Sequence, residues 1–411
     1  MSYQGHPVID SDSHIREYID IDRTFKDNMD PEYRDAYDDL SRAVKAHQSP
    51  GREQVLFMNA SAVIGPTAPR RPMGVHDRFG PPERQNKVAE ETVPDTGHTW
   101  QGNGIDMACN WDPSLRLRDM DTAQVDVSVM FPSQADGFCV LRDTGFEQAL
   151  YRAYHRFVSN FCADGDGRLR WVATSNLRDI RAGVDELIHW TERDENVAGW
   201  FIPRACPDGR LLDNPDLHRI FAAAQDLEVP IMVHGGTMRP PLTPGATELD
   251  NAGFIINAVY HGWGGMTAVS ALIGGGIFDL FPRLRVGIFE SGAGWLPWLV
   301  ERMDVAYRPS SGMTPNLSRK PSEVIAEGRL FCSIEPDEEH LDYAVEALGE
   351  DIWLFSTDYP HQGSPWPDGV PMVVDRKGLS GSAKIKMLGA NALRMFPRIA
   401  KKVTAVSVGG S

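Results

Sequence analysis

The sequence predicts an α/β fold, a closed (β/α)8 TIM barrel with a long insertion after its first strand. Short apolar segments recur along the chain, and segments with helical periodicity separate most of them. These apolar segments are Val8–Asp10, Val125–Phe131, Leu169–Thr174, Val197–Ile202, Val229–His234, Leu284–Glu290, Leu330–Glu335 and Ile352–Asp358. They are almost continuously hydrophobic, as expected of parallel strands that are covered on both faces. Potential metal ligands follow both the first and the last segment, and a closed barrel would bring these two strands together.

The segments between the predicted strands place apolar residues on one helical face. Between Phe146 and Phe161, apolar side chains recur at spacings of three and four residues. The same pattern predicts helices over Ile180–Thr191, Leu217–Leu227, Gly264–Gly274, Trp295–Tyr307 and Glu338–Leu348. Eight strand–helix units favour the closed barrel over an open doubly wound sheet.

The segment Ile19–Met107 interrupts this alternation. It is rich in proline, glycine and charged residues and has weak periodicity, yet a structureless loop of that length would be unusual in a compact domain. We therefore expect a partly helical insertion that forms a lid over the barrel mouth or a subunit contact. Residues 1–400 would form one domain, and residues 401–411 a flexible tail.

The composition excludes several classes of partner. The 411-residue chain has a net charge of −16, which argues against binding to nucleic acid or to an anionic membrane. No apolar stretch approaches the ~20 residues of a membrane span, and the first residues lack a signal segment, so we expect a cytoplasmic protein. The five cysteines lack Cys-x-x-Cys spacing and are predicted to be free thiols. The expected partners are a small-molecule substrate and a second copy or a homologous subunit.

Acidic and histidine side chains cluster at the ends of the predicted strands. Asp12 and His14 alternate along one extended segment, so both side chains point to the same side. The other candidate ligands are Glu17, His234, His261, Glu290 and Asp358. In a barrel these groups would converge at one mouth, where so many negative charges need a cation to offset them. The sequence therefore predicts one or two divalent ions, of Zn, Mn or Fe.

Four further side chains are candidates for chemistry or substrate binding. His261 could be a ligand, a proton shuttle or a substrate contact, or it could pack against Trp263 where a helix begins. Arg204 could bind a substrate carboxylate or form a surface ion pair. Trp295 could pack the sixth helix or line the pocket. His361 follows the eighth strand and is a candidate substrate contact.

Taken together, these motifs resemble the amidohydrolase superfamily, and within it the branch of aminocarboxymuconate-semialdehyde decarboxylase and the aromatic acid decarboxylases. The likeness rests on Val8-Ile9-Asp10-x-Asp12-x-His14, Asp112-Pro113-x-x-Arg116-Leu117-x-Asp119-Met120-Asp121, Val229-Pro230-Ile231-Met232-Val233-His234, Phe281-Pro282-Arg283-Leu284-Arg285-Val286 and Ser356-Thr357-Asp358-Tyr359-Pro360-His361. The resemblance implies a (β/α)8 barrel with one or two divalent metals. It implies that Asp12, His14, His234 and Asp358 are ligands. Glu290 departs from the family pattern, which usually has a histidine at that position.

The leading hypothesis is a metal-dependent hydrolase or decarboxylase of a small carboxylated metabolite, such as an aromatic acid. It would act through a metal-activated water, with Asp358 as proton acceptor. Glu290 would relay the proton, which requires a raised pKa, and His261 is a third catalytic candidate.

Two alternatives remain open at this stage. The candidate ligands outnumber those of one tetrahedral ion, and mixed carboxylate and imidazole ligands suit iron or manganese. The barrel could therefore be a dinuclear non-haem Fe or Fe/Mn oxygenase. It could also be a catalytically inactive partner of an active subunit.

Overall fold

The barrel is built from eight parallel strands. The computed structural model describes residues 2–17, 22–46, 99–100, 105–133, 138–139, 141, 143–206, 208–235, 253–314, 316–361 and 363–401. In order around the sheet, the strands are β3 (Ile9–Ile15), β6 (Val127–Pro132), β7 (Leu169–Ala173), β8 (Val197–Pro203), β9 (Ile231–His234), β10 (Val286–Ile288), β11 (Leu330–Ile334) and β12 (Trp353–Phe355). Each overlaps one of the apolar segments, so the predicted strands and the (β/α)8 barrel are confirmed.

Hydrogen bonds just past β12 join the last strand to the first. The carbonyl oxygen of Asp12 in β3 accepts a bond from the backbone N–H of Asp358 at 2.9 Å. The buried carboxylate of Asp10 accepts bonds from the backbone N–H of Thr357 at 3.1 Å and from its hydroxyl at 2.6 Å. These bonds hold the ends of the first and last strands side by side, as the barrel prediction requires.

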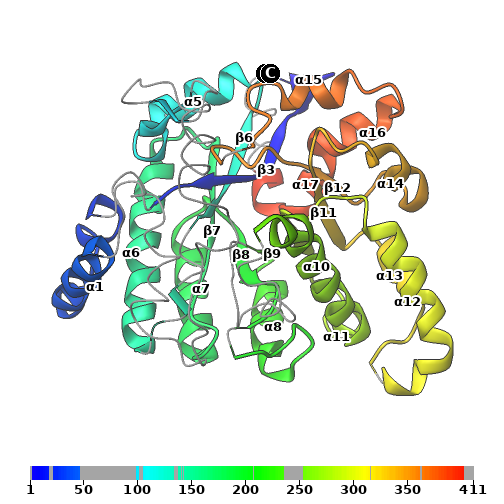
Figure 1. The fold of residues 1–411 in the computed structure, drawn as a ribbon, viewed down its shortest axis with the longest axis horizontal. Helices are drawn as coiled ribbons and strands as arrows, with labels where there is room; N and C mark the ends of the chain where they lie inside the picture. The colour runs from blue at the N-terminus through cyan, green and yellow to red at the C-terminus, as the bar shows by residue number, and fades with distance from the viewer. Residues whose placement is uncertain are drawn as a thin grey trace.

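Helices surround the strands (Figure 1). They are α1 (Arg34–Ala46), α5 (Pro113–Thr122), α6 (Thr144–Ala163), α7 (Ile180–Arg193), α8 (His218–Asp226), α10 (Gly253–Gly274), α11 (Ile277–Leu280), α12 (Leu296–Ser310), α13 (Pro321–Ala326), α14 (Leu341–Leu348), α15 (Gly369–Val374), α16 (Gly381–Ile385) and α17 (Asn391–Met395). Every helix predicted from periodicity overlaps one of these. Within the described part of the chain, no helix has the length and apolar character of a membrane span.

One helix boundary differs from the prediction in a way that matters for the site. Helix α10 begins at Gly253, well before Gly264, so His261 lies inside the helix and not at its entry. The glycines of this segment allow close packing of the helix against its neighbours. A Cβ atom at Gly265 would lie 2.9 Å from the Trp295 ring, so a larger residue would displace that ring. Tertiary packing thus overrides the low helix propensity of glycine.

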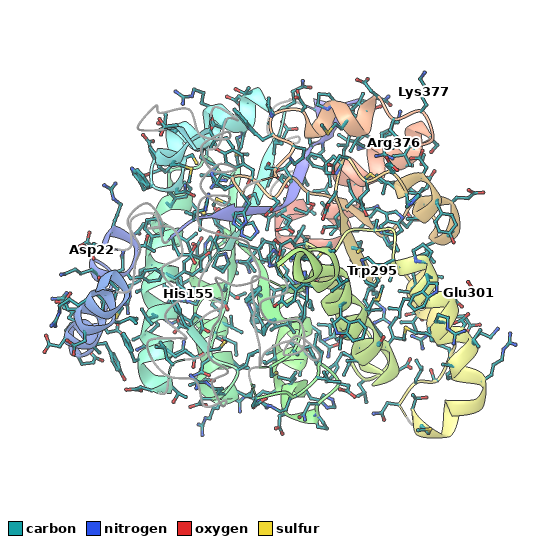
Figure 2. All side chains as sticks on the ribbon, viewed as in Figure 1. Asp22, His155, Trp295, Glu301, Arg376 and Lys377 are labelled. Atoms are coloured by element: carbon teal, nitrogen blue, oxygen red, sulfur yellow. The ribbon has the colours of Figure 1, made fainter. Side chains whose placement is uncertain are left out.

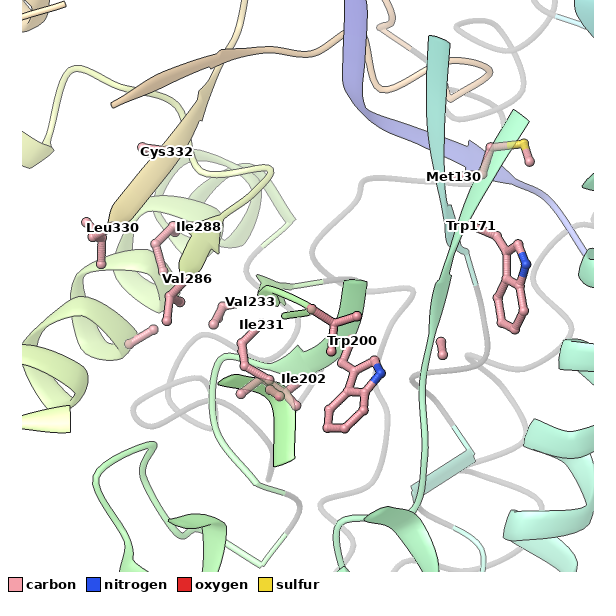
Figure 3. Packing of buried hydrophobic residues seen from close by; sticks show 14 of the residues in the cluster. Met130, Trp171, Trp200, Ile202, Ile231, Val233, Val286, Ile288, Leu330 and Cys332 are labelled. Atoms are coloured by element: carbon pink, nitrogen blue, oxygen red, sulfur yellow. The ribbon is translucent and has the colours of Figure 1, made fainter. Parts of the chain in front are cut away.

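Two apolar layers hold the barrel together. The interior is filled by side chains from the strands, including Ile9, Val129, Phe131, Val172, Phe201, Met232, Phe289, Phe331 and Leu354. Met395 of α17 and the adjacent Phe396 complete this cluster. The outer layer, between strands and helices, contains Trp171, Trp200 and Trp353 (Figure 3 shows the first two). The barrel interior is therefore a packed core and not an open channel.

The described part of the predicted insertion lies outside the barrel. Helix α1 lies beside α6 at the edge of the molecule (Figure 1), and Asp30 accepts hydrogen bonds from Arg152 and Arg156 of α6. The expected helical content of the insertion is therefore present. Residues 47–98 and 101–104 lie outside the described residues, as do residues 402–411, so the lid or subunit contact and the flexible tail stay predictions. All five cysteines are free and buried, as predicted.

Substitution of Asp10 should weaken the junction between β3 and β12. In Asp10→Ala the buried N–H and hydroxyl of Thr357 lose their acceptor, so the free energy of unfolding should fall by about 2–4 kcal/mol. Urea unfolding in the presence of a chelator measures this without a contribution from bound metal. The control is Asp226→Ala, which removes an exposed ion pair with Arg283 and should cost less than about 1 kcal/mol. Equal losses in the two variants would contradict this role for Asp10.

Candidate metal centre

The centre of the site is a buried group formed by β3 and β9. One carboxylate oxygen of Asp12, Oδ1, lies 3.5 Å from His14 Nε2 and 3.4 Å from His234 Nε2. All three side chains are at most 3 % exposed. The pairing register of β3 shifts between Asp10 and Ser13, a local irregularity of the kind that often re-aims side chains next to active sites. The predicted convergence of these three ligands is present in the structure, and they lie close enough to share one ion.

A second group overlaps the first through His14. Asp358 Oδ1 lies 3.2 Å from His14 Nε2 and 3.6 Å from His361 Nδ1. Asp358 follows β12 and has a φ of 54°, and Glu290, which follows β10, has a φ of 49°. Left-handed backbone is unfavourable for residues with a Cβ atom, and such strain is found preferentially at functional sites. The chain therefore carries backbone strain at both carboxylates that follow these strands.

Glu290 connects the site to helix α10. Its Oε2 atom lies 3.3 Å from His261 Nδ1 and 3.7 Å from His234 Nε2. His261 reaches the site from within α10 and contributes a group that lies between two strands in the sequence. The structure thus brings together six of the predicted ligands, namely Asp12, His14, His234, His261, Glu290 and Asp358.

These six residues each present one buried polar atom without a hydrogen-bond partner. The atoms are Asp12 Oδ1, His14 Nε2, His234 Nε2, His261 Nδ1, Glu290 Oε2 and Asp358 Oδ1, the same atoms that face one another across the site. Buried polar groups are nearly always satisfied, so a shared absence of partners indicates a missing common partner. A divalent cation accepts both carboxylate oxygen and imidazole nitrogen, and this mixed set suits Zn, Mn or Fe. The residues therefore fit a metal centre.

The electrostatics of the site favour a bound cation. Burial raises the pKa of Asp358 well above its usual range, and Glu290 and Asp12 add to the rise although His14 opposes it. Burial acts in the same direction on Glu290, but His261 and His234 outweigh it and lower the pKa of Glu290. The raised pKa that the sequence argument required for a proton relay at Glu290 was therefore wrong.

Glu17 occupies a different position from the other predicted ligands. Its carboxylate is buried and accepts a hydrogen bond at 2.9 Å from the backbone N–H of Ser133. The Ser133 hydroxyl lies 2.8 Å from His361 Nε2 and 3.4 Å from His14 Nδ1. Glu17 thus supports the serine that contacts two histidines, and it is absent from the ligand groups found among the described residues. Ser133 was missed in the sequence, where only its place directly after β6 marks it.

Arg204 lies beneath the site and not at the surface. It is 3 % exposed, and its Nη2 atom donates to the carbonyl oxygens of Glu290 at 2.6 Å and Phe289 at 3.1 Å. The alternative of a surface ion pair was therefore wrong, because the guanidinium supports the backbone of a candidate ligand. Contact with a substrate carboxylate stays a prediction.

A cavity of about 730 Å³ opens above the ligands. Asp12, Glu290 and Asp358 form part of its wall, and Trp295 forms another part, as one of the two sequence alternatives predicted. Figure 2 labels Trp295 at the start of α12, where its indole N–H donates to the carbonyl oxygen of Ser291 at 2.7 Å. Glu335, directly after β11, also lines the cavity and was missed in the sequence. Its signal was the same as that of Glu290, a carboxylate at a strand end.

Comparison with known families and proteins gives a consistent result. The model of a family described as amidohydrolase matches residues 105–398. Among curated proteins, the 2-amino-3-carboxymuconate-6-semialdehyde decarboxylase of Dictyostelium discoideum is 26% identical over 321 residues, which cover 71% of this chain and 78% of that protein.

Solved structures of decarboxylases share the fold. The 5-carboxyvanillate decarboxylase LigW of Sphingomonas paucimobilis is 20% identical, with a TM-score of 0.63 and coverage of 96% of this chain and 99% of that one. A 5-carboxyvanillate decarboxylase of Novosphingobium aromaticivorans, complexed with manganese and 4-hydroxy-3-methoxy-5-nitrobenzoic acid, is 18% identical, with a TM-score of 0.62 and coverage of 96% and 97%. At these identities the likeness shows the fold alone.

Substitution of Ser133 should weaken metal binding without unfolding the protein. In Ser133→Ala the His14 and His361 rings lose a shared hydroxyl partner, so the affinity for manganese should fall by about 10–100-fold, as for other groups that orient metal ligands. Titration of chelator-treated protein with manganese, followed by calorimetry, measures the change. The matched control is Ser159→Ala on α6, which removes a hydrogen bond from the Ser159 hydroxyl to Asp194 and should leave the affinity for manganese unchanged. Wild-type affinity in Ser133→Ala would show that this hydroxyl does not orient the ligands.

Proposed function

The chain belongs to the amidohydrolase family, and from this premise we propose that it is a metal-dependent enzyme that decarboxylates or hydrolyses a small aromatic carboxylate. The observation that carries the proposal is the set of six buried, unpartnered polar atoms at the barrel mouth. The family match and the decarboxylase names of the relatives described above support it.

The ligands fall into a central set and an additional pair. Asp12, His14, His234 and Asp358 would hold one divalent ion, since each lies within 3.5 Å of another member of this set. Glu290 and His261 form the pair that would complete a second position or act on protons. When bound, such an ion polarises a substrate oxygen and lowers the pKa of a coordinated water. Manganese is bound in the structure of one decarboxylase relative and is therefore the ion to test first.

Side chains of this protein would transfer the proton that either reaction requires. In decarboxylation the electron pair of the broken C–C bond stays on the ring carbon, which must then receive a proton. In hydrolysis a proton leaves water and reaches the leaving group. Burial raises the pKa of the Asp358 carboxyl, so Asp358 would carry this proton only while it does not coordinate the ion. At Glu290 the lowered pKa favours the charged carboxylate, whose Oε2 atom lies 3.3 Å from His261 Nδ1, so the imidazole is the candidate proton carrier of this pair.

One specific observation favours a second candidate function. The two overlapping ligand groups share His14, and the Glu290–His261 pair adds further donors, which together could hold two ions. Carboxylate-rich sets with two ions also suit iron, so a dinuclear Fe or Fe/Mn oxygenase is the alternative. The complete ligand cluster weighs against an inactive partner subunit.

Metal removal should separate these two functions. Manganese-loaded protein should release carbon dioxide from 2,6-dihydroxybenzoate, an aromatic monocarboxylate, and chelator-treated protein should not. Rates under argon and under air should be equal, because decarboxylation uses no oxygen. His234→Ala removes a central ligand and should lower manganese affinity by about 100-fold or more. Oxygen uptake in proportion to product by the iron-loaded protein would contradict decarboxylation and favour the oxygenase.

Substitution of Glu290 should test the proton role of its pair with His261. Glu290→Gln keeps the size of the side chain but removes the charge opposite His261 Nδ1, so kcat should fall by about 100- to 10,000-fold. The manganese bound by the central set should remain, as measured by elemental analysis of the same preparation. Glu301→Gln, on the exposed side of α12, is the control. If Glu290→Gln instead loses one of two bound ions, Glu290 is a ligand and not a proton carrier.

A further inference from the structure

One wall of the cavity is apolar and open. Val259, Trp263 and Met266 of α10 and Trp295 before α12 form this wall. Trp263 is 51% exposed and Val259 is 41% exposed, although large apolar side chains are usually covered. Apolar surface that is left open beside a polar centre is typical of ligand-binding sites. The wall therefore fits the flat body of an aromatic ring.

Another part of the cavity rim is acidic. It is formed by Glu335, Asp337 and Glu338, in the loop between β11 and α14. Glu338 has a structural role, because its carboxylate accepts hydrogen bonds from the backbone N–H groups of Ala293, at 2.8 Å, and Glu335, at 3.1 Å. This connection ties the rim to the loop before α12. Glu335 and Asp337 are exposed and face the cavity.

The described lining of the cavity holds more carboxyl groups than one bound divalent ion would neutralise. Its described lining contains six carboxylates, namely Asp12, Glu290, Glu335, Asp337, Glu338 and Asp358. One divalent ion would offset two of these charges and two ions would offset four. Burial, together with the charges of Glu338 and Asp337, raises the pKa of Glu335 to about 7, so the rim carries its full negative charge only above that pH.

The acidic rim and the metal centre belong to one cavity. Asp12, 1% exposed and with its Oδ1 atom unpartnered, lines the cavity together with Glu335 and Asp337. If the carboxylate of a substrate is held by the ion that Asp12 would bind, the other substituents of that substrate lie in the same cavity as the apolar wall and the acidic rim. Charges that line one cavity interact more strongly where water is partly excluded.

We propose that the cavity selects aromatic monocarboxylates whose remaining substituent is cationic or a neutral hydrogen-bond donor, and that Glu335 and Asp337 reject a second anionic group. This inference rests on the proposed function, since it assumes that one carboxylate is held at the metal centre. It goes further by assigning to two rim residues the choice among aromatic acids.

Three probes that differ only in the charge of one substituent test the selection. They are 3-(aminomethyl)benzoate, 3-(hydroxymethyl)benzoate and benzene-1,3-dicarboxylate, each titrated calorimetrically into the manganese-loaded full-length protein. The aminomethyl compound should bind at least about tenfold more tightly than the dicarboxylate, with the hydroxymethyl compound between them. The difference should shrink as salt rises from about 20 mM to about 300 mM, because salt screens the exposed rim.

Variants of the rim connect the selection to particular residues. Glu335→Gln combined with Asp337→Asn should bring the affinities of the aminomethyl and dicarboxylate probes to within about threefold of each other. Glu339→Gln removes an exposed charge beside the rim that does not line the cavity, and it should keep the wild-type order.

The outcomes separate this inference from the proposed function. The charge selection would be overturned if the wild type bound the dicarboxylate tightly. It would also be overturned if the double variant kept the wild-type order of affinities. In either case the proposed function would stand. If none of the three probes binds to manganese-loaded protein, the proposed function fails and the inference fails with it.

Discussion

The need to hold like charges close together in a buried space shapes this site. Asp12, Glu290 and Asp358 come from three strands that are distant in the sequence, yet the barrel brings them to one mouth. Imidazoles lie between them, and the ligand atoms have no hydrogen-bond partners. The carboxylates of such a cluster repel one another, and a divalent cation bound between them would replace this repulsion by attraction. The same cation would make the fold and its chemistry depend on each other.

The eight strands and the central ligands could be predicted because both leave local signals. Buried parallel strands are continuously apolar, and a charged or histidine residue directly after one, such as His234 or Asp358, stands out against it. Ser133 and Glu335 follow strands in the same way and were missed. Glu335 carried the same signal as Glu290, whereas serine is common in loops, so the position of Ser133 alone was a weak signal.

Three other features depend on contacts that no local pattern contains. His261 was expected at the entry of a helix that begins at Gly264, but the helix begins at Gly253, and Trp295 packs against its glycine face. Arg204 was considered as a surface residue, yet the backbone of Glu290 provides acceptors for its buried guanidinium. The lowered pKa of Glu290 results from His261 and His234, so it could be recognised only after the helix and the strand were placed together.

This dependence on neighbours gives the two carboxylates at β10 and β12 opposite properties. At Asp358, burial together with the charges of Glu290 and Asp12 outweighs the nearby His14 and favours the protonated form, whereas at Glu290 the imidazoles of His261 and His234 outweigh burial and favour the charged form. Pairs of titratable groups whose environments separate their pKa values are a common basis for acid–base catalysis. The replacement of the usual family histidine by Glu290 therefore need not remove a proton donor from the site. The imidazole of His261, brought in by α10, lies 3.3 Å from Glu290 and restores a histidine to the same part of the cavity.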